Sequence, residues 1–424
     1  MKLFRQWIGG TGSRLDIILF GGFIGSLFSF LQFISSPVIG QLSDRYGRRT
    51  VLLLSMLGNG LSMLLWIFSG SFGVFIWSRI VGGLTEGNVQ MSIAIISDIT
   101  SANERSKNLA WVGISFALGF TVGPPLGAYF ASVNLKQFFP SLPINQYSSP
   151  ALFAFMLIVI ETVYLYLYLP ETSMLDAMSP MTPKAPGDEE EDTDALLVGT
   201  DKANMDARLQ QHGTKDNPHS IARQMAILSA VHFIYLFVFS GMEFTLTFLT
   251  YDRFQFSHLE QGKLLAFMGI SSAVVQGGYV RRVTHKYVTE KAIVVQGIAS
   301  CAIGLAIVGL LATDTTRLYI GAAFLAFTSG TVVNTLTSLA SLTHQRGKKS
   351  ATMGIPQQRL GLALGKFRSL GQLGRSIGPI VACSCYWILG NKAVYAIASV
   401  SMAFICIGVS VFVESIPLKK SKKA

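Results

Sequence analysis

The stretch "GQLSDRYGRR", residues 40–49, carries Asp44, Arg45, Arg48 and Arg49 within six positions and has long apolar stretches on both sides. A charged side chain is costly at the centre of a lipid bilayer and much less costly at its surface. The stretch therefore predicts a charged turn at a membrane surface, where one apolar helix ends and the next begins.

The composition of the whole chain is that of a membrane protein. Of the 424 residues, 50% are hydrophobic and only 13% are charged, which leaves too little polar surface for a soluble globule of this size. Apolar runs of about 20 residues recur, the length that a helix needs to cross a bilayer. The net charge of +11 comes from Lys and Arg in short loops and in a "LKKSKKA" tail, which favours retention at a membrane over nucleic-acid binding.

Length and flanking charge define the apolar spans, and they predict an all-α integral membrane protein. Five spans precede a long polar segment and six follow it. The eleven spans are residues 16–39, 50–69, 72–97, 108–131, 149–169, 224–249, 261–280, 291–312, 317–341, 362–389 and 393–413.

The polar segment is rich in Pro, Asp, Glu, Lys and Gly, which predicts a disordered linker whose "GDEEEDTD" run is solvated. The chain then divides into an N-terminal segment (1–15), a first helical bundle (16–169), the linker (170–223), a second bundle (224–413) and a basic tail (414–424).

Basic residues concentrate in alternate loops, and this bias predicts the orientation in the membrane. If the 40–49 loop faces the cytosol, the linker and the C-terminus also face it, in the plasma membrane or an internal membrane. The further basic residues on this side are Arg105, Lys107, Arg281, Arg282, Lys286, Lys291, Arg346, Lys348 and Lys349, whereas the other loops hold single charges such as Lys136, Arg317 and Lys392.

The spacing of the charged turn resembles the signature loop of the major facilitator superfamily, which lies between the second and third of twelve membrane helices. The resemblance implies two pseudo-symmetric helical bundles and a gate at this loop. Asp44 is then expected to accept bonds from a neighbouring helix N-terminus, and Arg48 and Arg49 to pair with an acid, for which Asp98 is the candidate. The gate-loop residues are Gly40, Asp44, Arg45, Gly47, Arg48 and Arg49, together with Asp98.

Two glycine-rich stretches, "GFTVGPPLGA" and "LGRSIGPIVA", agree with this family. The first resembles the antiporter signature of the family's fifth helix, and the second is its copy in the eleventh helix, as expected for duplicated six-helix halves. Small residues four positions apart let two helices touch. The motif residues are Gly119, Gly123, Pro124 and Gly127 in the first half and Gly374, Gly378 and Pro379 in the second.

Aligned on these motifs, the chain begins at the family's second helix, so about eleven of twelve helices are expected and the first is absent. A second departure lies before the copied motif, where "GIPQQRLGLALGKF" is expected to be an insertion whose Arg359 and Lys366 are unfavourable in lipid. Both departures favour a chain of reduced activity.

The stretches "SGMEFTLTFLTYDRFQFS" and "RSLGQLGRSIGP" look most like the tetracycline-transporter-like branch of the drug:proton antiporters. The resemblance implies a secondary transporter that moves organic anions or amphipathic drugs by alternating access, in exchange for protons. The alternatives are a truncated form or membrane scaffold without transport, and a uniporter or lipid or sugar transporter of the same fold.

Polar residues inside spans are the candidates for transport. Glu243 lies in mid-span and is the candidate carrier of a proton or another cation, with a structural pairing to an Arg as the alternative. Arg375 is the candidate fixed charge for an anion. Glu161 is expected to be structural. His232 is expected to be a core histidine with its hydrogen bonds satisfied, with a proton relay as the alternative.

A second set of candidates lies in the fourth helix of the family. Arg79, which the family pattern carries there, and Glu86 are seven positions apart, so they are expected on one face of that helix, where Arg79 either binds an anion or neutralises Glu86. Asn88 and Gln90 lie close by in the sequence.

The chain has no catalytic constellation and no phosphate-binding or metal-ligand motif, so an enzyme, a cofactor and a metal site are not expected. The four cysteines fall inside apolar spans and are expected to be small core residues. The expected partners are the lipid bilayer, a small organic substrate and protons, with the protein a monomer and no nucleic acid bound.

Overall fold

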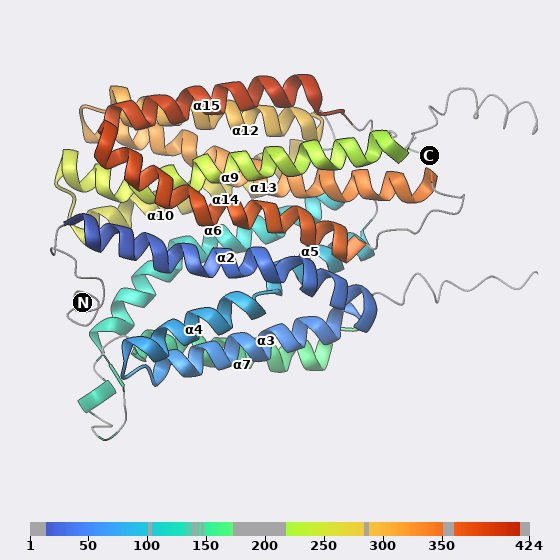
Figure 1. Cartoon of the computed structure of the whole chain (residues 1–424), viewed down its shortest axis with the longest axis horizontal. Coiled ribbons are helices and arrows are strands. Elements are labelled where there is room, and N and C mark those ends of the chain that lie inside the picture. The colour runs from blue at the N-terminus through green and yellow to red at the C-terminus, as the bar shows by residue number, and fades with distance from the viewer. Residues whose placement is uncertain are drawn as a thin grey trace, which may run out of the picture.

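Helices form every membrane-spanning element of the computed structural model, which describes residues 14–100, 104–133, 135–137, 141, 144–145, 148–172, 218–283, 288–350 and 360–415. Helices of the first half pack together in one bundle (Figure 1). They are α2 (Arg14–Tyr46), α3 (Arg48–Ile67), α4 (Phe72–Thr85), α5 (Asn88–Ile99), α6 (Arg105–Ser132) and α7 (Ser148–Tyr168), with a short 3₁₀ turn at Leu135–Gln137.

The second half begins with a helix of 37 residues, α9 (Pro218–Phe254). It continues with α10 (His258–Val274), the π-helical turn η2 (Val275–Val280), α11 (Arg281–Val283), α12 (Glu290–Ala306), the π-helical turn η3 (Ile307–Leu311), α13 (Thr315–Ser350), α14 (Leu360–Leu389) and α15 (Asn391–Phe412).

The prediction of an all-α membrane protein with eleven spans is confirmed, because a helix or a helix pair covers each predicted span. Six of the described helices are long and apolar enough to cross a membrane by length and composition alone. The predicted linker and basic tail fall mostly on residues 173–217 and 416–424, which lie outside the described residues.

The predicted insertion before the second glycine motif is wrong in its second part. Residues 351–359 lie outside the described residues, but Leu360 begins α14, which continues unbroken to Leu389. Gly361 and Gly365 in its first turns pack closely against the α2 backbone, and Lys366 is exposed. These residues are therefore the start of a membrane helix, whose small residues allow close packing.

The two halves meet mainly where α2 lies along α14 and where α6 packs against α10 (Figure 1). Serines of α14 donate hydrogen bonds into the α2 backbone: Ser369 Oγ to the carbonyl of Phe33 (2.6 Å) and Ser376 Oγ to that of Ser26 (3.1 Å). The α2–α14 contact therefore extends over several helical turns.

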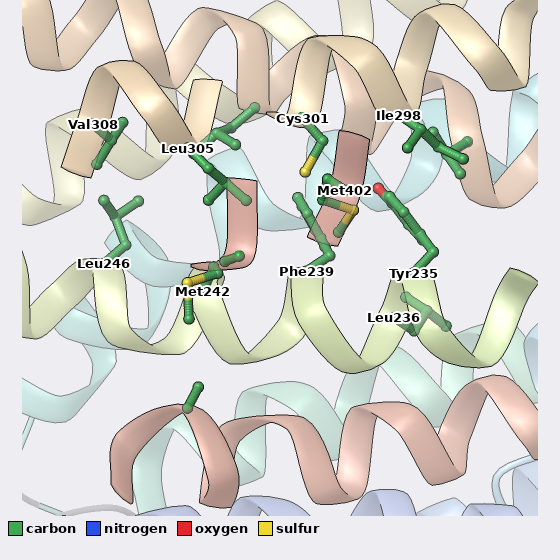
Figure 2. Close-up of a cluster of buried hydrophobic side chains, with 14 of the residues drawn as sticks. Tyr235, Leu236, Phe239, Met242, Leu246, Ile298, Cys301, Leu305, Val308 and Met402 are labelled. Atoms are coloured by element: carbon green, nitrogen blue, oxygen red, sulfur yellow. The ribbon is translucent and has the colours of Figure 1, made fainter. Parts of the chain in front are cut away.

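The second half contains the main apolar core (Figure 2). Side chains of α9, including Phe239 and Met242, face Cys301 and Leu305 of α12, and Met402 of α15 closes the cluster. All four cysteines are free; Cys301 and Cys383 are buried, as expected of core residues, whereas Cys385 and Cys406 are only half-buried. The close packing of this core fixes the positions of the second-half helices that line the site described below.

Candidate functional site

One end of the bundle, which we call the basic face, carries the α2–α3 turn, the α5–α6 connection and the start of α14. Here the Asp44 carboxylate accepts the backbone N–H groups of Gly361 (2.9 Å) and Leu362 (2.8 Å). These N–H groups belong to the first turn of α14 and have no partner within their own helix. The positive end of the helix dipole favours the carboxylate there, so Asp44 of the first half holds a helix of the second.

Arg48 extends this contact into a network. Its guanidinium bonds Asp44 (2.7 Å) and Asp98 (2.9 Å), and it also donates to Ser43 Oγ (2.7 Å). The side chains of Arg48 and Asp44 are only 5% and 4% exposed. The acid chosen from the sequence is therefore the one that Arg48 contacts, and the pair with Asp44 is buried.

No ion pair joins Arg49 to Asp98 among the described residues, so the expectation that Arg49 pairs with this acid is wrong. Its guanidinium donates to the carbonyl of Tyr166 (2.6 Å) within the first half. Its backbone N–H and that of Arg48 donate to the Glu171 carboxylate (3.1 and 2.8 Å). Glu171 thus caps the N-terminus of α3. The guanidinium of Arg49 contacts α7 and not Asp98.

Two glycines are required by this geometry. Gly47 adopts φ +95°, a left-handed conformation that links α2 to α3, and a Cβ there would collide with the carboxylate of Glu171. A Cβ at Gly40 would collide with the backbone of Gly361. Arg45 is exposed and lies over the Tyr46 ring (5.3 Å), outside the network.

Arg105 makes a second contact between the halves. It is fully buried and donates to Ser341 Oγ of α13 (3.2 Å) and to the carbonyls of Ser97 (2.6 Å) and Thr100 (3.1 Å). The sequence marked Arg105 only as a loop charge, because its partner on α13 lies 236 residues away.

The two glycine motifs have different surroundings. A Cβ at Gly374 or Gly378 would run into the α9 backbone, so α9 and α14 pack backbone to backbone. At Gly119, Gly123 and Gly127 of α6, no described atom would lie within 4 Å of such a Cβ. Pro379 lies inside α14, whereas the side chain of Pro124 is not described.

A cavity of about 180 Å³ lies between the halves. It is bounded by α5 and α6 from the first half and by α9, α10, η2, α13 and α14 from the second. Aromatic rings form much of its wall, with Tyr235 stacked on Phe239 (5.4 Å) and His232 on Phe367 (4.4 Å between ring centroids).

Three charged side chains line this cavity: Glu243 of α9 and Arg368 and Arg375 of α14. Glu243 and Arg375, two sequence candidates, are thus brought together, and the guanidinium of Arg375 acts electrostatically on the carboxylate. No ion pair joins them among the described residues. Arg368 was missed, although its spacing of seven from Arg375 places both on one helix face.

The candidates in the fourth helix of the family separate. α4 ends at Thr85 and α5 begins at Asn88, so Glu86 lies in a break and does not share a continuous helix face with Arg79. Arg79 lies over the Trp66 ring (4.2 Å) and is not part of the cavity wall. The guanidinium of Arg79 therefore interacts with an aromatic ring of α3, and the expectation that it shares a helix face with Glu86 is wrong.

Glu86 has other partners. Its carboxylate accepts from Asn59 Nδ2 (3.2 Å) and is acted on electrostatically by Arg368 of the second half. Gln90 lines the cavity and donates to the carbonyl of Ser36 (3.0 Å), whereas the side-chain oxygen of Asn88 is buried without a partner among the described residues.

His232 and Glu161 are the two remaining candidates from the sequence. Nδ1 of His232 is buried without a hydrogen-bond partner among the described residues, so the prediction of a satisfied core histidine is wrong. Glu161 is exposed on α7, away from the cavity wall.

An amide pair that the sequence did not indicate also lines the cavity. Asn334 Nδ2 of α13 donates to Gln276 Oε1 (2.9 Å), and Gln276 lies in the π-helical turn η2. A Cβ at Gly113 of α6 would collide with both amides. The periodicity of an apolar span does not show where a helix widens into a π turn, so this pair could not be found from the sequence.

The sequence of the chain is similar to a family model and to several known proteins. The model of the Major Facilitator Superfamily matches residues 18–355. The chain is 35% identical over 411 residues to the human Major facilitator superfamily domain-containing protein 10, covering 93% of this chain and 81% of that protein. It is 36% identical over 132 residues to Tetracycline resistance protein, class B, of Escherichia coli, which is 31% of this chain and 32% of that protein.

A solved structure has the same fold. The crystal structure of the human organic anion transporter MFSD10 (TETRAN) superposes with a TM-score of 0.71 and 32% identity, covering 96% of this chain and 88% of that one. The chain therefore belongs to the major facilitator superfamily, in its tetracycline-transporter-like branch, and is a multi-pass membrane transporter rather than an enzyme.

Proposed function

We propose that this protein is a proton-coupled secondary transporter of amphipathic organic anions or drugs, working by alternating access. The observation that carries the proposal is the cavity between the halves, which holds Glu243 beside Arg368 and Arg375. A fixed positive charge binds an anion, and a titratable acid in the same cavity can carry a proton. The name of the similar human protein, an organic anion transporter, supports the same substrate class.

In alternating access, contacts between the two halves close one end of the cavity and must break when that end opens. The network at the basic face contains such contacts. Asp44 bonds the first turn of α14, and Arg105 bonds α13, so both contacts would break if the halves separated at this end. We propose that the gate is closed here and that rocking of the two halves opens the cavity toward the basic face.

The sense of proton coupling follows from the charge of the substrate. An anion binds Arg375 more tightly when Glu243 carries a proton, because a neutral acid no longer offsets the guanidinium. Proton and anion then bind together and move in the same direction. For organic anions, this proposal replaces the exchange with protons that the sequence led us to expect. A drug with a positive group competes with the proton for Glu243, so exchange with protons remains the proposal for that class.

The test uses the whole chain in liposomes and an aromatic sulfonate, which stays ionised at the pH values used. Uptake should be saturable, and Arg375→Gln should lower it about tenfold or more, since a charge-assisted hydrogen bond is lost. Arg79→Gln, outside the cavity, is the matched control and should keep near-normal uptake. Equal uptake by Arg375→Gln and the unaltered chain would overturn the proposed site.

The basic face is proposed to be cytosolic, and with it the linker and the C-terminus. An epitope placed after residue 415 or within residues 173–217 should be reached by antibody only in cells whose plasma membrane is permeabilised. Staining of intact cells, if the protein is at the surface, would reverse the proposed orientation.

A membrane scaffold without transport is the second candidate, and the open glycine face of α6 favours it. Gly119, Gly123 and Gly127 lack described neighbours, whereas the copied motif in α14 packs on α9. A folded chain that binds the sulfonate probe but never moves it across liposomes would favour the scaffold over the transporter.

A further inference from the structure

We propose that Arg368 and His232 form a second anion-binding subsite, and that the preferred substrate is an organic dianion with an apolar or aromatic spacer. The inference rests on the proposed function and adds the number and spacing of the substrate's negative groups. Arg375 takes one group and Arg368, assisted by His232, takes the other.

The two arginines have the right placement for this. They are seven residues apart on α14, which puts them on one face, separated along the axis by roughly 10 Å. Both line the cavity. Gly371 lies between them in the sequence, and a Cβ there would collide with the His232 imidazole, so this ring packs on the α14 backbone at a level between the two arginine positions.

Two nitrogen atoms of the subsite lack partners. Arg368 Nε and His232 Nδ1 are buried, and neither has a hydrogen-bond partner among the residues of the described chain. His232 as a whole is only 4% exposed and lines the cavity. A carboxylate or sulfonate oxygen from the substrate would satisfy the guanidinium N–H, and the imidazole tautomer with its proton on Nδ1 would donate a second bond.

An acid offsets the charge of each arginine in the cavity. Glu86 acts electrostatically on Arg368, and Arg375 acts on Glu243, but no direct ion pair forms in either case among the described residues. A substrate anion in direct contact can therefore replace each carboxylate. Because Glu86 belongs to the first half and Arg368 to the second, occupation of this subsite also weakens an attraction between the halves.

The aromatic side chains that line the same cavity as the arginines suit an apolar spacer. His232 and Phe367 stack on each other, and Tyr235 and Phe239 form a second stacked pair in the same cavity. Burial of an apolar spacer against these rings adds affinity without a further polar contact. A substrate with a single negative group would leave one of the two arginines without its contact.

The experiment measures binding to the purified full chain in lipid nanodiscs. The probes are α,ω-dicarboxylic acids of increasing length, each compared with its own monomethyl ester. A dicarboxylate whose groups lie roughly 10 Å apart should bind about tenfold more tightly than its monoester, and shorter acids should show less advantage. This comparison needs no variant. Equal affinity of acid and ester at every length would overturn the second subsite.

Variants of Arg368 and Glu86 test whether these residues cause the affinity advantage of the dicarboxylate. Arg368→Gln should remove the advantage of the dicarboxylate over its monoester, Arg368→Lys should keep part of it, and Glu86→Gln should increase it. Arg79→Gln is the control and should leave the ratio unchanged. An advantage that persists in Arg368→Gln would also overturn the assignment.

The result separates this inference from the proposed function. Monoester binding that depends on Arg375, with no gain for any dicarboxylate, would contradict only the second subsite. If neither probe binds at any length, both this subsite and the anion-transport proposal are contradicted.

Discussion

Replacement of Glu243 by glutamine is expected to abolish accumulation of an organic anion driven by a pH gradient, while exchange of labelled for unlabelled anion continues. Glutamine keeps the shape of the side chain but cannot take up a proton, so the carrier loses its coupling ion. The half-buried carboxylate in the cavity with Arg375 is the basis of this expectation. In liposomes with an alkaline interior and an acidic exterior, the anion should no longer accumulate above its external concentration.

Glu161→Gln is the matched control for this prediction. Glu161 also lies within an apolar helix, but it is exposed on α7 and does not line the cavity. Its replacement should leave gradient-driven uptake near normal. If Glu243→Gln abolished exchange together with accumulation, Glu243 would be a structural partner of Arg375 and not a proton carrier.

Asp44→Asn should open the gate at the basic face. The side chain of Asp44 is buried with Arg48, and removal of one partner of a buried pair costs about 3–5 kcal/mol in general. Part of that loss weakens the bonds to Gly361 and Leu362, so the population of the state open at the basic face should rise severalfold or more. Expression should stay near normal, because each half keeps its own core.

The measurement is the labelling rate of a cysteine at position 337, replacing the cavity residue Thr337, in a chain whose native cysteines are replaced. Labelling from the basic face should be faster in Asp44→Asn. Asp314→Asn is the control, because Asp314 pairs with Arg317 at an exposed site where the acid is 52% exposed. Equal labelling in Asp44→Asn and the unaltered chain would leave the loop as a membrane anchor only.

The fold was predictable because the signals are local and strong. Apolar runs of about 20 residues define spans whatever their packing, and the charged turn with Gly47 marks the end of one helix and the start of another. The pairing of Arg48 with Asp98 was also predictable, because both lie at the same end of neighbouring spans. Its burial was not, and burial is what makes the expected effect of Asp44→Asn larger than that of a surface pair.

The parts of the site that were missed depend on contacts between distant segments. Glu171 caps α3 from 122 residues away, and Arg368 faces Glu86 only after the two halves assemble. The break at Glu86 falls in the polar stretch "TEGNVQ", residues 85–90, whose polar residues were interpreted as transport candidates and not as the end of a helix. From the sequence, Arg79 was expected to bind an anion or to neutralise Glu86, but its guanidinium lies over the ring of Trp66 of α3.

The central claim is that anion and proton cross together through the cavity that holds Glu243. It is tested most directly by internal pH in liposomes that contain the chain, start without a pH gradient and have their membrane potential clamped. An aromatic sulfonate is added outside, and a trapped dye reports internal pH while labelled sulfonate reports entry. The account predicts that the interior acidifies as the sulfonate enters, and that Glu243→Gln removes this acidification. Entry of the sulfonate with no change of internal pH in the unaltered chain would contradict the account.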